Sequence, residues 1–234
     1  MTDMIRTAAP LSRKLGDLGR VAALMGLGLL AACSNAPEAG KTTGFVKGIF
    51  TKSSAQPRSA EEISAEAAAA LQRTDARVIL ISLPSVEVTT VMQKLEQNGA
   101  YETYGTADRR SLTLRNGMLT ASRSIGSDLM SADVTEALRL VSARRAGQAV
   151  RVYRHLDGEN LTVATRMRCD IRTGGTSQMA VGEIKATVTK VIESCTGEAQ
   201  SFENIYQVDG AGRILASKQW LSAERGAISI QQLR

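Results

Sequence analysis

The sequence has few of the residues on which most catalytic and metal sites depend. It contains one histidine, His155, three cysteines and only 3% aromatic residues in a chain of 234. A Ser-His-Asp triad would have to use His155, but no Gly-x-Ser-x-Gly motif accompanies it, and a single histidine makes a poor metal site. Cys-x-x-Cys redox pairs are also absent. We therefore expect a protein that is not an enzyme and that holds no metal or cofactor.

The carboxylates leave one catalytic alternative open. Several aspartates, including Asp128, Asp157 and Asp209, lie in or near expected turns. Glycoside hydrolysis needs only two carboxylates, about 5–10 Å apart. Aspartate is also a frequent turn former, because its side chain hydrogen-bonds to nearby backbone N–H groups. We favour the turn-forming role for these residues.

The chain begins with an apolar run that is too short to span a membrane. Residues 21–32 are apolar and follow Arg13, Lys14 and Arg20, but they make up only about half of the ~20 residues that a spanning helix needs. The pattern predicts a signal peptide over residues 1–32, removed from the mature protein. The alternative is a short buried helix that ends in an ordinary cysteine.

The end of this run also carries a lipidation motif. Residues 30–33, Leu-Ala-Ala-Cys, resemble the lipobox of bacterial lipoproteins. The resemblance implies cleavage before Cys33, a diacylglycerol on its thiol and an acyl chain on its new amine. Several acyl chains on one residue hold a protein firmly at a bilayer. Because Ser34 rather than Asp follows, the resemblance favours the periplasmic leaflet of the outer membrane over the inner membrane.

The two remaining cysteines, Cys169 and Cys195, are expected to form a disulfide. The lipidation motif places the chain in an oxidising compartment, where disulfides persist. Two cysteines without histidine neighbours do not complete a tetrahedral zinc site. Free buried thiols are the remaining alternative.

The chain beyond Cys33 divides into a tether and one expected domain. Residues 33–58 are rich in Ser, Gly, Thr, Lys and Pro and lack any sustained period, which is typical of a flexible linker. Residues 59–234 are expected to form a single β-rich periplasmic domain. Ser59 and Glu62 make a capping box ahead of an alanine-rich run, which predicts a helix over residues 60–73.

Most of the expected domain has the alternating pattern of β-strands. Asn116-Gly117 is a type I′ turn signal, and it predicts a hairpin that pairs Leu114 with Leu119 and Leu112 with Ala121. A second helix is expected within residues 131–147, with Gly147 as its end, and Gly174-Gly175 is expected in a hairpin loop. At least eight strands against one or two peripheral helices predict a mainly β fold of curved antiparallel sheets, barrel-like or sandwich-like.

Several motifs occur in a characteristic order between residues 60 and 234. They are Leu83-Pro84, SLTLRNGMLTASRSIGSDLMSAD, VYRHLDGEN, the two cysteines, and FENIYQVDGAGRILASKQWLSAERGAISI. In this order they resemble the YjbF family of lipoproteins, which is related to the capsule lipoprotein GfcB. The resemblance implies a β-rich lipoprotein that acts as a non-catalytic accessory factor in exopolysaccharide or capsule production and export.

A ligand surface is the last expectation. Aromatic rings can stack on sugars, and arginine guanidinium groups bind carboxylates or phosphates through paired hydrogen bonds. The candidate ligand residues are Trp220, Tyr206, Tyr153, Arg154, Arg166 and Lys218, with Arg151 and Arg168 nearby. The alternative is that Trp220 fills the core and that the arginines form a solvated strand face. The formal net charge is +6, and removal of residues 1–32, with four basic and two acidic residues, lowers it to +4. This modest positive balance suits anionic partners or a plain solvated surface, and we expect no nucleic acid partner.

Two functions are therefore weighed. In the first, the tethered protein contacts a polysaccharide or an export-machinery protein. In the second, it is a structural envelope lipoprotein that recruits protein partners without touching sugar. A small basic groove lined by aromatic rings would favour the first, and a flat apolar patch or an exposed sheet edge would favour the second.

Overall fold

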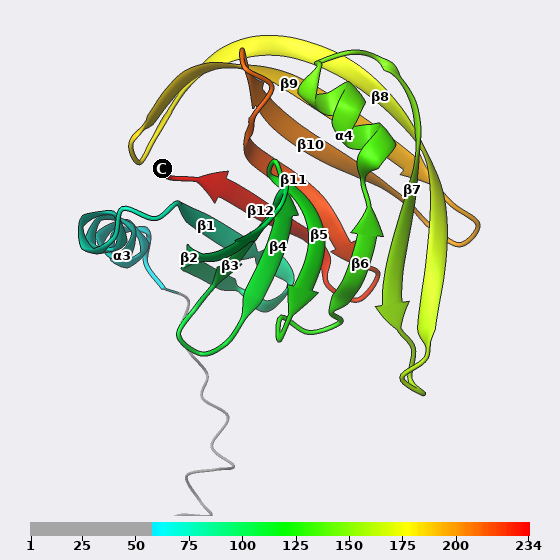
Figure 1. Cartoon of the computed structure of the whole chain (residues 1–234), viewed down its shortest axis with the longest axis horizontal. Coiled ribbons are helices and arrows are strands. Elements are labelled where there is room, and N and C mark those ends of the chain that lie inside the picture. Colours follow the sequence, from blue (N-terminus) through cyan, green and yellow to red (C-terminus); the bar gives the residue numbers. More distant parts are fainter. Residues whose placement is uncertain (1–57) are drawn as a thin grey trace, which may run out of the picture. The chain divides into compact units, whose positions relative to one another are not determined.

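The computed structural model describes residues 58–234. The predicted signal peptide, Cys33 and the predicted tether up to residue 57 lie outside the described residues. The described chain is mostly β, as predicted, with all strand pairs antiparallel and two α-helices (Figure 1). Its strands are β1 (Val78–Leu83), β2 (Val88–Asn98), β3 (Tyr101–Gly105), β4 (Ser111–Arg115), β5 (Met118–Arg123), β6 (Leu129–Asp133), β7 (Gly147–Leu156), β8 (Thr162–Val181), β9 (Ile184–Thr196), β10 (Ser201–Asp209), β11 (Ile214–Ser222) and β12 (Gly226–Gln232).

The described strands form one sheet that curls into an almost closed barrel. Their order is β5-β4-β3-β2-β1-β12-β11-β10-β9-β8-β7-β6, and Figure 1 shows the two end strands, β5 and β6, next to each other. Side chains rather than a backbone ladder bridge this seam. The Arg123 guanidinium donates to the carbonyl of Leu129 at 3.0 Å, and Ser122 Oγ accepts from the Leu129 N–H at 2.9 Å. The apolar side chains that face inward make up the core.

The Asn116-Gly117 hairpin forms with the predicted turn. Both residues have positive φ, 47° and 81°, as a type I′ turn requires. Leu114 pairs with Leu119 as predicted, but Leu112 pairs with Ser122 rather than Ala121. A bulge beyond Leu114 inserts one extra residue into β5, and this shifts the register by one.

The two helices differ in how well the sequence predicts them. Helix α3 (Ala60–Arg73) has the predicted bounds, and the predicted capping box between Ser59 and Glu62 is formed. Helix α4 (Thr135–Ser142) is shorter than the predicted segment, because residues 129–133 form β6 and Gly147 begins β7 instead of ending the helix. The apolar face of α4 joins the core inside the barrel.

The long hairpin of β8 and β9 arches over the barrel (Figure 1). Gly174-Gly175 lies within β8 rather than in a loop, at an irregularity in the pairing between Thr173 and Thr176. Glycines at a bulge let a strand bend. The hairpin tip reaches the C-terminus, where the Glu183 N–H donates to the carbonyl of Leu233 at 2.8 Å.

Candidate functional site

The predicted aromatic ligand residues lie inside the barrel. Trp220 stacks on Phe202 at 4.6 Å between ring centroids and meets the edge of Tyr153 at 4.9 Å. The exposed fractions of Trp220, Tyr153 and Tyr206 are 8%, 1% and 0%. In this structure the three rings therefore fill the core, and they do not form one surface with the arginines and Lys218.

The single histidine belongs to the same cluster. The His155 ring meets Trp220 edge-on at 5.5 Å between centroids, and its Nε2 lies 2.9 Å from the carbonyl of Leu221. The first is an aromatic packing contact and the second is a hydrogen bond to a backbone oxygen, and both link β7 to β11. They leave the ring half-buried.

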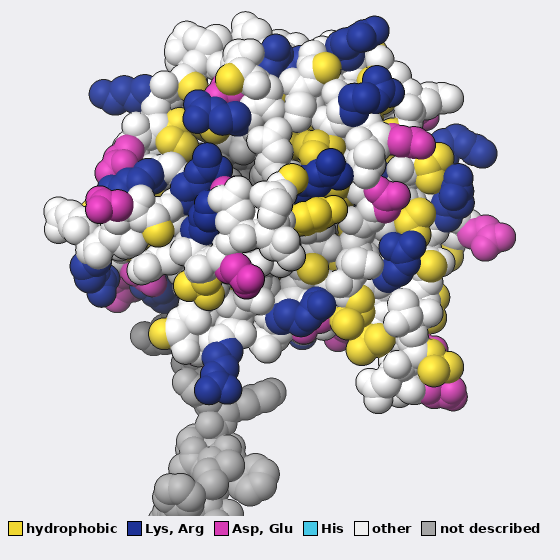
Figure 2. All heavy atoms as spheres, in the orientation of Figure 1, with side chains coloured by type: hydrophobic (Ala, Val, Ile, Leu, Met, Phe, Trp, Pro, Cys, Tyr) yellow, Lys and Arg dark blue, Asp and Glu magenta, His cyan; other side chains and the backbone are white. Residues whose placement is uncertain are grey.

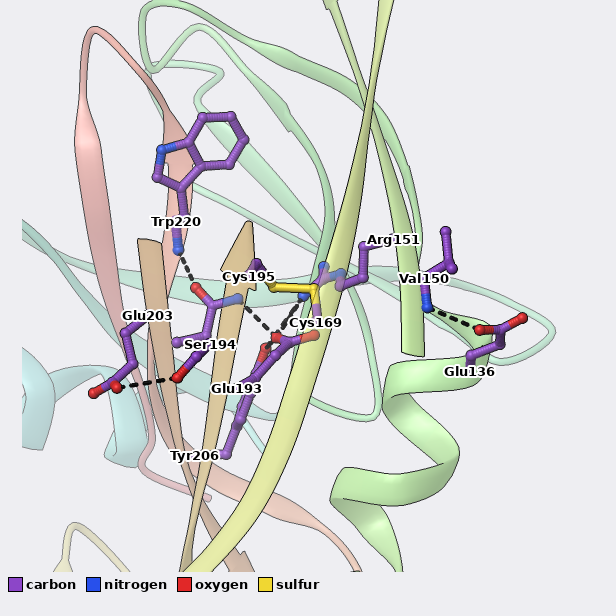
Figure 3. Close-up of a disulfide and its surroundings, with 11 residues drawn as sticks. Glu136, Val150, Arg151, Cys169, Glu193, Ser194, Cys195, Glu203, Tyr206 and Trp220 are labelled. Atoms are coloured by element: carbon purple, nitrogen blue, oxygen red, sulfur yellow. Dashed lines mark hydrogen bonds and ion pairs between the residues drawn. A yellow bond between two sulfur atoms is a disulfide. The ribbon is translucent and has the colours of Figure 1, made fainter. Parts of the chain in front are cut away.

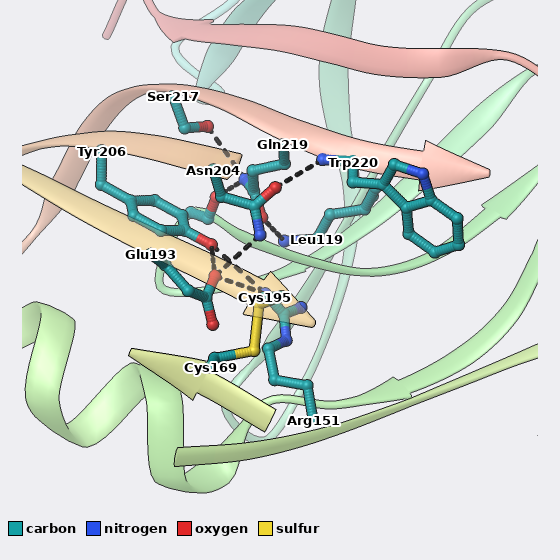
Figure 4. A network of polar contacts seen from close by, with 11 residues as sticks. Leu119, Arg151, Cys169, Glu193, Cys195, Asn204, Tyr206, Ser217, Gln219 and Trp220 are labelled. Carbon is teal, nitrogen blue, oxygen red and sulfur yellow. Dashed lines mark hydrogen bonds and ion pairs between the residues drawn. A yellow bond between two sulfur atoms is a disulfide. The ribbon is translucent and has the colours of Figure 1, made fainter. Parts of the chain in front are cut away.

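A buried polar network runs through the same interior (Figures 3 and 4). Glu193 Oε2 accepts hydrogen bonds from Arg151 Nη1 at 3.0 Å, Tyr206 Oη at 2.7 Å and Asn204 Nδ2 at 2.7 Å. The Asn204 amide oxygen in turn accepts from the backbone N–H of Trp220. Burial and the Glu193 charge raise the pKa of Tyr206 well above its ordinary value, so this hydroxyl stays a donor. This network could not be recognised from the sequence, because Arg151 stands between apolar residues as a solvent-exposed arginine of a strand would.

The disulfide predicted between Cys169 and Cys195 is present. The two residues face each other in register on β8 and β9, and both are buried (Figure 3). Potential ligand atoms of Cys169, Cys195 and Glu193 lie within 4.8 Å of one another. The sulfurs are bonded to each other and offer no thiolate, so this trio is not a metal site.

The turn aspartates have the predicted turn-forming role. Asp157 Oδ1 accepts from the N–H groups of Glu159 and Leu161 at the β7–β8 turn. Asp209 Oδ1 accepts from the N–H groups of Ala211 and Arg213 at 2.9 and 2.8 Å. These two carboxylates stabilise the turns in which they lie.

The outer face of β7 and β8 carries three arginines close together, two of them predicted ligand residues and the third a neighbour of these. Arg154, Arg166 and Arg168, here called the arginine row, alternate with buried residues and so point away from the core. Val152 pairs with Arg166, and Arg154 pairs with Ala164, which brings the three positions together across the two strands. Within residues 58–234 none of the three forms a salt bridge.

A groove runs beside this row. It has a volume of about 660 Å³ and lies between residues 163–168 of β8 and residues 196–199, which comprise the end of β9 and part of the β9–β10 turn. We call it the β8 groove. Arg166 and Arg168 line it, Glu198 adds one carboxylate, and no aromatic ring is among its lining residues in the described chain. Lys218 is exposed on β11 and does not line it.

The β8 groove forms because the N-terminal end of β8 extends beyond the end of β9. Pairing with β9 begins at Arg168, whereas pairing with β7 extends back to Thr162. The β7–β8 ribbon therefore projects past its neighbour, as Figure 1 shows at the lower right. Its end carries Leu156, Leu161 and Val163, with exposed fractions of 43%, 60% and 48%.

The face shown in Figure 2 carries Lys and Arg side chains interspersed with Asp and Glu, and the β8 groove has two arginines and one carboxylate in its lining. The sequence matches the family described as "Group 4 capsule polysaccharide lipoprotein gfcB, YjbF" over residues 48–233. The chain therefore belongs to the YjbF family of capsule polysaccharide lipoproteins.

A solved structure confirms the fold. The chain is similar to the hypothetical lipoprotein YmcC from Escherichia coli (K12), with a TM-score of 0.63 and 13% identity over 85% of this chain and 98% of that one. No curated protein matches the sequence. Within residues 58–234, no helix is long and apolar enough to cross a membrane.

Proposed function

We propose that this protein is a lipid-anchored periplasmic accessory factor in capsule or exopolysaccharide production and export, and that it acts without catalysing a reaction. Cys33 carries the diacylglycerol and acyl chain that hold it in the periplasmic leaflet of the outer membrane. The partners are the polysaccharide itself or proteins of the export machinery.

The observation that carries this proposal is the family match over residues 48–233. It supports a capsule role and a lipoprotein anchor, and the Leu-Ala-Ala-Cys sequence at residues 30–33 supplies the residue for that anchor. The structure adds support for a binding role, since the candidate acid–base residues His155, Asp157 and Asp209 are engaged in packing and turn contacts.

The test compares a deletion strain with a Cys33→Ala strain. We expect a lipid-precursor label on the wild-type protein and its loss in Cys33→Ala, and secreted polysaccharide reduced in both strains. Membrane fractionation separates outer from inner membrane anchoring. Unchanged polysaccharide in the deletion strain, with no second copy of the gene, would contradict the proposal.

The structural envelope lipoprotein is the second candidate, and one observation favours it. Residues 162–167 of β8 have a strand partner on the β7 side only, so the chain has an exposed sheet edge at which another protein strand can pair. This candidate predicts that the deletion strain loses envelope integrity, measured as detergent sensitivity, while polysaccharide output stays unchanged.

A further inference from the structure

The three guanidinium groups of the arginine row form no salt bridge within the described chain. Other arginines of the same strands do: Arg151 pairs with Glu193 inside the barrel, and Arg172 pairs with Glu203 at 2.9 Å on the outside. Near Arg154 lies Asp133, whose pKa is lowered mainly by the Thr135 N–H and hydroxyl and to a smaller degree by Arg154. Asp133, and Glu198 in the groove, offset part of the positive charge, but no carboxylate of the described residues forms a salt bridge with the row, so its guanidinium groups keep donors for an external anion.

The spacing of the row suits an anion with repeated charges. Arg166 and Arg168 are two residues apart on one strand, which places their Cα atoms about 6.6 Å apart. Arg154 continues the row across the ladder, diagonal to Arg166. Sugar acids linked in a chain present carboxylates at intervals of one or two sugar units, and these intervals are of the same order as the distance between Arg166 and Arg168. Guanidinium groups bind such carboxylates through paired hydrogen bonds.

The β8 groove offers what a glycan needs besides charge. Its volume of about 660 Å³ lies within the range of ligand pockets. Val163 and Ala164 supply apolar contact for sugar C–H groups. The open edge of β8 supplies backbone N–H and C=O groups for sugar hydroxyls, and Glu198 adds an acceptor.

Two other ligands fit the observations less well. An anionic bilayer that met the apolar end of the β7–β8 ribbon would first approach the carboxylates of Asp157 and Glu159 in its turn. An added protein strand would have only the short edge at residues 162–167, next to Arg166, and charged side chains at short edges are a common protection against strand pairing.

We propose that the arginine row and the β8 groove bind an acidic polysaccharide, with Arg154, Arg166 and Arg168 as the ligands of its carboxylates. This inference rests on the proposed function for the kind of molecule that is bound. Its binding test nevertheless needs no knowledge of the natural polymer.

The test measures binding of three polymers to the full-length lipidated protein in uncharged detergent. Polygalacturonate carries a carboxylate on every sugar, hyaluronate on every second sugar, and dextran carries none. The test variant is Arg154→Gln/Arg166→Gln/Arg168→Gln. The control is Arg109→Gln/Arg139→Gln/Lys185→Gln, which removes the same charge from exposed positions that form no salt bridge within residues 58–234.

We expect an acidic polymer to bind and dextran not to bind. The row variant should bind that polymer at least about tenfold more weakly, which corresponds to about 1.4 kcal/mol, while the control stays close to wild type. Affinity should fall as salt rises, because salt screens exposed charges. Thermal unfolding of both variants checks that the fold is retained.

Several results would overturn the inference. They are no binding of either acidic polymer, equal losses in the two variants, or binding of the unlipidated Cys33→Ala protein to phosphatidylglycerol vesicles but to neither polymer, which would assign the row to a membrane. Polysaccharide output in the deletion strain separates this inference from the proposed function. If that output falls but neither polymer binds, the inference fails and the proposed function stands.

Discussion

Removing one charge from the buried pair of Arg151 and Glu193 should destabilise the fold strongly, because the other charge is then left buried and unpaired. The exposed fractions of the two side chains are 1% and 0%, so neither charge reaches water. Glu193→Gln keeps the size of the side chain but leaves the Arg151 guanidinium buried without a counter-charge. Breaking such a pair costs about 3–5 kcal/mol. We expect a fall of that size in the free energy of unfolding.

The assay is urea unfolding followed by the fluorescence of Trp220, the only tryptophan in the chain. Its backbone N–H is bound to Asn204, which also contacts Glu193, so the probe lies beside the perturbation. The matched control is Glu203→Gln, which breaks the outer pair with Arg172. That pair is 58% and 44% exposed, and its loss should cost less than about 1 kcal/mol.

A double-mutant cycle tests the cause. Arg151→Met and Glu193→Met each leave one buried charge unpaired, and the combined variant removes both charges. The combined variant should be more stable than the sum of the single effects predicts, by at least about 2 kcal/mol. Additive effects, or a Glu193→Gln cost no larger than that of Glu203→Gln, would refute the argument.

Three further predictions concern stability. Replacing both Cys169 and Cys195 by Ala should lower the free energy of unfolding by about 3 kcal/mol, seen as a lower urea midpoint than that of the oxidised protein. Asp209→Asn should cost about 1–2 kcal/mol at neutral pH. Burial alone would raise the pKa of Asp209, but the backbone N–H and guanidinium donors of Arg213 lower it below the ordinary value. The stability that the ionised carboxylate contributes is therefore lost as pH falls through this lowered pKa. In acid, the unfolding free energies of the variant and the wild type should become equal. Gly117→Ala should cost more than about 1 kcal/mol, because φ is +81° and the new Cβ would lie 2.7 Å from the Ile214 carbonyl; an unchanged melting temperature would contradict this.

Local signals predicted the elements whose geometry depends on a few neighbouring residues. The capping box of Ser59 and Glu62 predicted the start of α3, and Asn116-Gly117 predicted the turn between β4 and β5. The bulge in β5 was not predictable, because nothing in the alternation of that strand marks an extra residue. A bulge is stabilised by what the strand packs against, which is a tertiary contact.

The site was harder to predict, for a related reason. Alternation shows that Arg151 and Arg154 lie on opposite faces of β7, but it does not show which face is the core. Glu193 and Asn204, which make a buried arginine tolerable, come from β9 and β10, far along the chain. The groove depends on the unequal lengths of β8 and β9, which short-range patterns do not encode.

The buried Arg151 and the disulfide also support the arginine row on the outer face of β7 and β8. The disulfide and the Arg151–Glu193 pair join β7, β8 and β9 just behind the arginine row, at the point where the ribbon leaves its neighbour. A ribbon fixed at this point presents its arginines in one arrangement before a ligand arrives. Binding then pays less conformational entropy for ordering them. The variant without the disulfide should therefore bind acidic polymers more weakly although it keeps every residue of the row, and unchanged affinity in a folded sample would show that the row does not need this support.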